Sequence, residues 1–242
     1  QPGRTDAQLM VARLRSARGD YQAAIEAYTQ AIEGGLQIED VLEPLASAYI
    51  GVGDQAKADQ LYKDALTKRP NEISWLMARS RILIGTLAHT EAIPLLRRVL
   101  AKESNNLDAH EWIAGAYAAV ANDHQALDHY RRVIGLDPGR SYVYTRMGDL
   151  HYGMRDFQDA RKTYEMAIDR GVRTAEAYAG LGLAEEELSR YRNARTAYRR
   201  ARDRDPGNEI ARKGLQRMRS KIRPPRRQPT ASESADRGRR MM

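Results

Sequence analysis

Apolar residues recur three or four positions apart along most of this chain, in stretches that short polar turns separate. Within residues 39–72 the first stretch contains Leu42, Leu45 and Tyr49, and the second contains Ala58, Leu61, Tyr62, Ala65 and Leu66. This spacing is typical of amphipathic α-helices, which bury one face. Between the stretches lies Gly53-Asp54, where glycine permits a left-handed exit from a helix and aspartate can cap the next one. The pattern therefore predicts two helices joined by a tight turn.

This helix pair recurs every 34 residues, in six consecutive repeat units: 5–38, 39–72, 73–106, 107–140, 141–174 and 175–208. Position 20 of the unit is always alanine: Ala24, Ala58, Ala92, Ala126, Ala160 and Ala194. Position 8 is always small, and position 24 is tyrosine in every unit but the third. Small residues let paired helices approach closely, and tyrosine can fill the remaining space while its hydroxyl reaches the polar rim. We therefore expect the units to stack into one continuous core.

The unit closely resembles the tetratricopeptide repeat (TPR), which has small and aromatic residues at positions 8, 20, 24 and 27 and a terminal proline, here Pro70, Pro138 and Pro206. The resemblance covers residues 5–208 and implies an all-α fold, a right-handed superhelical solenoid of six TPR helix pairs. Residues 209–222 are expected to form a capping helix, residues 1–4 an N-terminal arm, and residues 223–242 a disordered basic tail. The third unit departs from the pattern, with Leu87-Ala88 in place of Gly-Asp.

Composition excludes several functional classes. The chain has no cysteine, so it cannot form a disulfide, a thiolate nucleophile or a cysteine-ligated metal site. Its longest apolar run, Trp112 to Ala121, is far shorter than the roughly 20 residues that a membrane-spanning helix needs. Of the net charge of +8, residues 223–242 contribute six arginines against two acidic residues. The repeat region is therefore nearly balanced, which weakens a prediction of nucleic-acid binding from charge alone.

Candidate catalytic and cofactor motifs are weak. His124 and Asp128 are four residues apart on a predicted helix, but two ligands do not make a metal site. Gly51-Val52-Gly53 fits a dinucleotide-binding pattern only loosely, because a helix rather than a strand precedes it. The run Glu185-Glu186-Glu187 is interpreted as a solvated helix face. We therefore predict a non-enzymatic protein with no catalytic residue, no metal, no cofactor and no small-molecule substrate.

The TPR resemblance directs attention to the concave groove, which in this family is lined by positions 2, 5, 6, 9, 12 and 13 of each first helix. In units three to five these positions combine apolar anchors with charges: Met77, Arg81, Ile84, Glu111, Trp112, Tyr142, Arg146, Asp149 and Tyr152. Such a surface suits an amphipathic helix or peptide of a partner protein. The alternative is that Trp112 packs between repeats and Met77 fills a gap. The lysine and asparagine that grip chaperone C-termini in some TPR domains are absent.

Three hypotheses remain for the partner. Six TPR units and a first residue, Gln1, that is not methionine resemble pilotins, bacterial outer-membrane lipoproteins that escort a secretin subunit during pilus assembly. That resemblance implies a periplasmic or outer-membrane location, on the inner leaflet, with an acylated cysteine before Gln1. Gln1 could equally mark a cloning boundary. The second hypothesis is a cytoplasmic adaptor that organises an enzyme or regulatory complex. The third is binding of nucleic acid or an anionic membrane through the arginine-rich tail.

Overall fold

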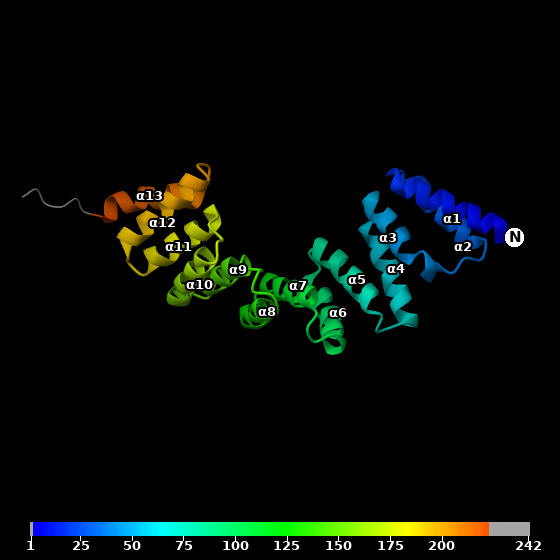
Figure 1. Ribbon diagram of the computed structural model, residues 1–242, viewed down its shortest axis with the longest axis horizontal. Helices are drawn as coiled ribbons and strands as arrows, with labels where there is room; N and C mark the ends of the chain where they lie inside the picture. Colours follow the sequence, from blue (N-terminus) through cyan, green and yellow to red (C-terminus); the bar gives the residue numbers. More distant parts are fainter. Residues whose placement is uncertain (1, 223–242) are drawn as a thin grey trace, which may run out of the picture. The chain divides into compact units, whose positions relative to one another are not determined.

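The computed structural model describes residues 2–222, which form thirteen α-helices, one short 3₁₀ helix and no strand (Figure 1). The first helices of the pairs are α1 (Pro2–Ala17), α3 (Leu42–Gly51), α5 (Ile73–Gly85), α7 (Leu107–Ala119), α9 (Val143–Gly153) and α11 (Ala175–Glu187). The second helices are α2 (Tyr21–Glu33), α4 (Gln55–Lys68), α6 (His89–Lys102), α8 (Asp123–Leu136), α10 (Phe157–Asp169) and α12 (Tyr191–Arg204). The final helix, α13 (Glu209–Lys221), packs against α12. The predicted all-α fold of adjacent helix pairs is confirmed.

The 34-residue period of the sequence is reproduced in the helices. The second helix of each repeat unit begins 34 residues after the second helix of the unit before it, at residues 21, 55, 89, 123, 157 and 191. The six alanines at position 20 are all fully buried. Their partners at position 24 are also buried: Tyr28, Tyr62, Leu96, Tyr130, Tyr164 and Tyr198. Burial of the same two positions in each pair produces the core that the repeat pattern predicts.

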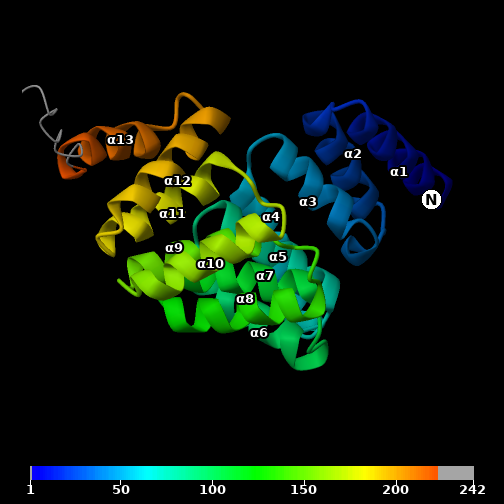
Figure 2. The same ribbon diagram turned by 60° about the vertical axis from the view of Figure 1, so that its left-hand side comes forward.

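The chain divides into two compact bodies. The N-terminal body extends to Arg140 and contains α1 to α8, and the C-terminal body begins at Ser141 and contains α9 to α13. Within each body, helices that follow one another in the sequence pack side by side. In both views α13 lies along α12, at the end of the C-terminal body (Figures 1 and 2).

The turn between the two helices of a pair has the same backbone in all six repeat units. Position 15 has a positive φ at Gly19 and Gly53, as expected for glycine, and also at four residues with a side chain: Leu87, Ala121, Arg155 and Ser189. The left-handed turn therefore persists where the Gly-Asp pair is missing. Packing of the two helices dictates this conformation, and L-residues adopt it at a cost in free energy.

The ends of some elements differ from those that the sequence predicts. α1 begins at Pro2, so residues 2–4 of the expected N-terminal arm belong to this helix, and proline suits a first helical turn because its missing N–H needs no partner there. A 3₁₀ helix, η1 (Ile38–Asp40), precedes α3, which begins only at Leu42. The basic tail expected over residues 223–242 lies outside the described residues.

Candidate functional site

A pocket of about 620 Å³ opens in the N-terminal body between α3 and α5, with contributions from α4 and α7. Its lining combines apolar, hydroxyl and charged side chains: Glu43, Pro44, Ser47, Ile50, Tyr62, Ser74, Met77, Ala78, Arg81, Ile82 and Trp112. We call it the α3–α5 pocket. Nearly all of these residues come from first helices, at the repeat positions that form the groove of TPR proteins. The regular stacking of the pairs therefore places them on one surface.

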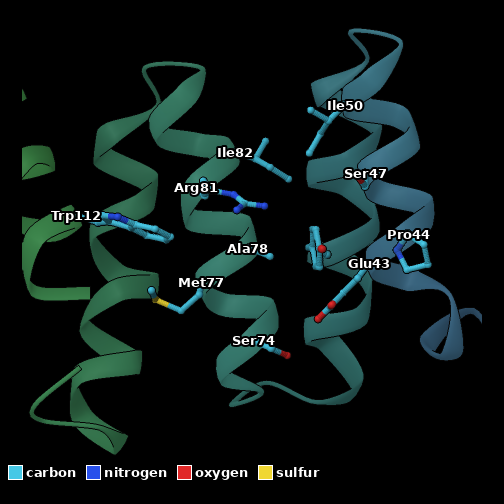
Figure 3. A pocket seen from close by; sticks show the side chains of 11 residues that line it. Glu43, Pro44, Ser47, Ile50, Ser74, Met77, Ala78, Arg81, Ile82 and Trp112 are labelled. Atoms are coloured by element: carbon cyan, nitrogen blue, oxygen red, sulfur yellow. The ribbon is translucent and has the colours of Figure 1, made fainter. Parts of the chain in front are cut away.

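The α3–α5 pocket has an apolar interior and charged edges. Tyr62 and Ile82 are buried, whereas Met77 and Trp112 are half-buried and remain accessible. The charged side chains of Glu43 and Arg81 are exposed and extend from opposite helices into the space between α3 and α5 (Figure 3). An apolar interior between two opposite charges can hold one large apolar side chain while the charges orient the segment that carries it.

The charges act on the buried phenol of Tyr62. Burial, with a smaller contribution from the Glu43 carboxylate and partial opposition from Arg81, raises the pKa of Tyr62 to about 12. Within residues 2–222, no hydrogen bond or ion pair joins Glu43 or Arg81 to another side chain. Both charges are therefore available to a ligand, and Tyr62 remains a neutral hydrogen-bonding group at physiological pH.

In the N-terminal body, three of the predicted groove residues lie together. Met77, Arg81 and Trp112 all line the α3–α5 pocket. Ile84 lies on the same helix as Met77 and Arg81 but does not contribute to the lining. Glu111 is half-buried and accepts a hydrogen bond from Nη1 of Arg140.

Arg140 also donates from Nη2 to Oδ1 of Asp108, at 2.9 Å. The guanidinium thereby ties the start of α7 to the turn after α8, 29 to 32 residues later. Glu111 thus has a structural ion pair in addition to any role in the groove.

The four other predicted residues belong to the C-terminal body. Tyr142 and Arg146 are exposed at the start of α9. Asp149 accepts a hydrogen bond of 2.6 Å from the hydroxyl of Tyr164, and desolvation raises the pKa of its carboxyl. Tyr152 is half-buried, and its ring lies 5.4 Å from that of Phe157.

The interpretation of Glu185-Glu186-Glu187 as a solvated helix face is wrong. Glu185 is only 4% exposed. Glu186 receives hydrogen bonds from the Tyr198 hydroxyl at 2.8 Å and from Nη2 of Arg217 at 2.7 Å. Only Glu187 is exposed. The run lies where α11 packs against α12 and α13, so tertiary partners at positions 198 and 217 satisfy charges that the local sequence places on a helix surface.

Residues 2–222 contain neither a metal-binding cluster nor a membrane-spanning helix. No cluster there combines three or more histidine, aspartate or glutamate side chains in a geometry that could hold a metal ion. None of the helices in this part of the chain has both the length and the apolar character needed to cross a bilayer.

Tyr62, Glu43 and Ile82 are pocket residues that the predicted set of groove residues does not include. Glu43 occupies a first-helix groove position in the second repeat unit, one unit before the predicted centre of the groove. Tyr62 belongs to the second helix of its pair, where its place in the repeat indicates core packing. The repeat position alone does not reveal that Tyr62 also faces a pocket.

Comparison with known proteins supports the repeat assignment. Residues 9–42 and residues 145–209 match two family models, each described as a tetratricopeptide repeat. Together with the helix pairs, these matches confirm that the chain carries TPR repeats and that its fold is that of a TPR solenoid.

Two curated relatives cover most of this chain. Human protein O-mannosyl-transferase TMTC1 is 22% identical over 216 residues, which are 88% of this chain and 24% of TMTC1. Anaphase-promoting complex subunit 3 of Schizosaccharomyces pombe is 24% identical over 172 residues, which are 70% of this chain and 26% of that subunit. This chain therefore spans about a quarter of the length of these relatives.

Solved structures show the same fold. A crystal structure of MamA has a TM-score of 0.65 at 20% identity and covers 69% of this chain and 91% of MamA. A crystal structure of YrrB, described as a TPR protein with an unusual peptide-binding site, has a TM-score of 0.66 at 16% identity and covers 79% of this chain and 99% of YrrB. At these identities the likeness concerns the fold alone.

Proposed function

We propose that this protein is a non-catalytic interaction scaffold and that the α3–α5 pocket holds a peptide segment of a partner protein. The observation that carries the proposal is the half-buried pair Met77 and Trp112 beside the unpaired charges of Glu43 and Arg81. Tryptophan and arginine are residue types enriched at binding hot spots. YrrB, a protein of similar fold, is described as binding peptide.

The pocket also defines the chemistry of the segment. A volume of about 620 Å³ accommodates a large apolar side chain and part of its neighbours. Glu43 on α3 favours a basic residue on one side of that anchor, and Arg81 on α5 favours an acidic residue on the other. We therefore expect a short peptide with an aromatic or long aliphatic anchor between residues of opposite charge.

A peptide library displayed on phage can test this proposal. Peptides selected on the wild-type protein should bind the double variant Met77→Ala/Trp112→Ala at least about tenfold more weakly, because the variant removes the apolar contacts of the anchor. The matched control is Leu87→Ala/Val120→Ala, which shortens two exposed apolar residues outside the pocket. Equal affinities for the pocket variant and the wild type, with circular dichroism unchanged, would exclude the α3–α5 pocket as the peptide site.

A charge exchange tests the orientation. The double variant Glu43→Arg/Arg81→Glu should bind the selected peptides weakly and bind peptides with their two charged residues exchanged more tightly. Loss of binding to both peptide series in a folded variant would mean that Glu43 and Arg81 do not recognise the charged residues on either side of the anchor.

Narrower roles remain predictions. None of the relatives described above is named as a pilotin or a secretin partner, so an escort function in pilus assembly has no support from them. A periplasmic or outer-membrane location, and the alternative of a cytoplasmic adaptor, can be separated by fractionating the native host and probing for this chain. The transferase named among the relatives shares only a quarter of its length with this chain, and we propose no catalytic role.

A further inference from the structure

Positive charge is concentrated at the end of the described chain. Residues 190–221 contain 12 arginines and lysines against 3 aspartates and glutamates, a net charge of +9. This exceeds the net charge of +8 of the whole chain, so the rest of the protein is slightly acidic in total. The arginine-rich tail is therefore only part of the basic region, and α12 and α13 supply the larger share in ordered structure.

On α12 the arginines are arranged along one side. Four of them lie three or four residues apart, which places them on one side of a helix: Arg192, Arg195, Arg199 and Arg202. We call this row the α12 arginine stripe. The helix buries a different side, made of Ala194, Ala197, Tyr198 and Ala201. At 1.5 Å per residue the stripe is about 15 Å long.

The stripe is not used to hold the fold together. In the described part of the chain, Arg192, Arg195 and Arg199 have no ion pair or hydrogen bond to another side chain. Among the described residues, Arg202 pairs only with its exposed sequence neighbour Asp203, at 2.9 Å. Arg217 on α13 is different, because it is bound to the largely buried carboxylate of Glu186. The stripe therefore presents uncompensated guanidinium groups at the exposed Arg192 and Arg199 and at the half-buried Arg195, and a fourth group with a weak surface partner at Arg202.

The chemistry of the stripe favours a linear polyanion. Exposed ion pairs with protein carboxylates contribute little, and α12 has no exposed aromatic or aliphatic anchor beside the arginines that would support a protein interface. A bilayer surface would gain from apolar side chains that enter the lipid, but the exposed residues between Arg192 and Arg202 are Asn193, Thr196, Arg199 and Arg200. A nucleic-acid backbone needs neither a hydrophobic anchor nor side chains that enter lipid. Its binding releases condensed counterions, and guanidinium groups match the geometry of phosphate oxygens.

We infer that the α12 arginine stripe is a second interaction surface, independent of the α3–α5 pocket, that binds the phosphate backbone of a nucleic acid without reading its sequence. The absence of an exposed aromatic residue beside the stripe on α12 argues against base stacking. Binding should therefore be strongly salt-dependent and similar for unrelated sequences of the same length.

Fluorescence anisotropy of the full chain with a labelled DNA duplex of about 30 base pairs tests this inference. The triple variant Arg192→Gln/Arg195→Gln/Arg199→Gln should bind at least about tenfold more weakly at about 50 mM salt. The plot of log binding constant against log salt concentration should become shallower by about 2 to 3, since each lost phosphate contact removes about 0.9 from its slope. The tail is the same in both proteins, so the difference reports the stripe.

The matched control is Arg18→Gln/Lys63→Gln/Arg97→Gln, which removes the same charge from three exposed sites of the N-terminal body. It should retain the wild-type slope. If the stripe variant binds the duplex as tightly as this control, the inference is overturned. It is also overturned if the stripe variant keeps its duplex affinity but no longer binds vesicles containing about 30% phosphatidylserine, since the stripe would then serve a membrane. Peptide binding at the α3–α5 pocket should be unchanged in both variants, so failure of one proposal does not imply failure of the other.

Discussion

Gly182 on α11 faces the ring of Tyr198 on α12 so closely that a Cβ atom at Gly182 would lie 2.5 Å from two carbons of that ring. On its other side the ring has the same relation to Gly214 of α13, also at 2.5 Å. The tyrosine hydroxyl donates to Glu186 at 2.8 Å. Three helices thus meet around one aromatic ring, and only glycine fits at the two closest points.

Gly182→Ala should therefore destabilise the C-terminal body by about 1–3 kcal/mol, because the added methyl group must displace the Tyr198 ring in a closely packed core. Thermal unfolding followed by circular dichroism measures the effect. The control is Gly153→Ala, also on a helix of this body, where an added Cβ meets no atom within 4 Å. That control should be neutral or slightly stabilising, as alanine favours helix over glycine. A melting temperature of Gly182→Ala at or above that of the wild type would contradict the packing described.

Leu87→Gly should stabilise the N-terminal body by about 0.5–1 kcal/mol. Leu87 has a φ of 61°, so its left-handed backbone costs free energy of folding. Its side chain is 78% exposed, so its removal loses little packing. Part of the gain is offset because glycine makes the unfolded chain more flexible. Leu87→Ala retains the left-handed cost and should give no comparable gain. Urea unfolding midpoints distinguish the two variants, and a less stable Leu87→Gly would show that the turn is not strained.

Glu186 should make the C-terminal body sensitive to acid. Burial opposes ionisation of this carboxyl, but hydrogen bonds from Arg217 and Tyr198 outweigh it and hold the pKa of Glu186 below its ordinary value of 4.5. A carboxyl whose pKa is lowered by folding stabilises the native state above its unfolded pKa, and this contribution is lost as the pH falls below about 4.5.

Glu186→Gln should thus lower the free energy of unfolding at pH 7 by about 1–3 kcal/mol and flatten its decline in acid. Unfolding by urea at pH 7 and at successively lower pH values measures both effects. A variant with the wild-type pH profile would show that Glu186 does not carry this dependence.

The histidine pair of the N-terminal body, His110 and His129, should make stability depend on pH in a different range. Nδ1 of His110 lies 2.9 Å from Nδ1 of His129, and His110 is only 8% exposed. Burial and then the charge of His110 lower the pKa of His129 from its ordinary value of 6.5, while Asp128 raises it. The unfolded chain therefore binds the proton more readily, and stability should fall as the pH drops below about 6.5.

His129→Gln should remove this loss between about pH 7 and pH 5 while leaving the steeper acid transition of Glu186 in place. The measurement is the same urea series, extended to neutral pH. An unchanged profile in this range would assign the dependence to another group.

The sequence by itself determines the repeat architecture, because the same spacing of small, aromatic and apolar residues occurs six times. The buried alanines such as Ala160 and the tyrosines such as Tyr198 follow from their period alone, since residues three and four apart share a helix face. The pairing of small residues with tyrosine also follows, and the contact of Gly182 with Tyr198 is an instance of it. The sequence likewise identifies Met77, Arg81 and Trp112 as candidates for a shared surface.

The tertiary structure alone decides which polar groups find partners. Glu111 meets Arg140 29 residues later, and Glu186 meets Arg217 31 residues later, so no local pattern contains either pair. The same holds for Leu87, whose left-handed backbone is imposed by the packing of two helices against the preference of its own side chain. Long charged side chains reach several ångströms in any direction, and their partners depend on how neighbouring repeat units are spaced. The repeat period of the sequence therefore predicts the apolar core, whereas the charge network and the pocket depend on how the helices pack.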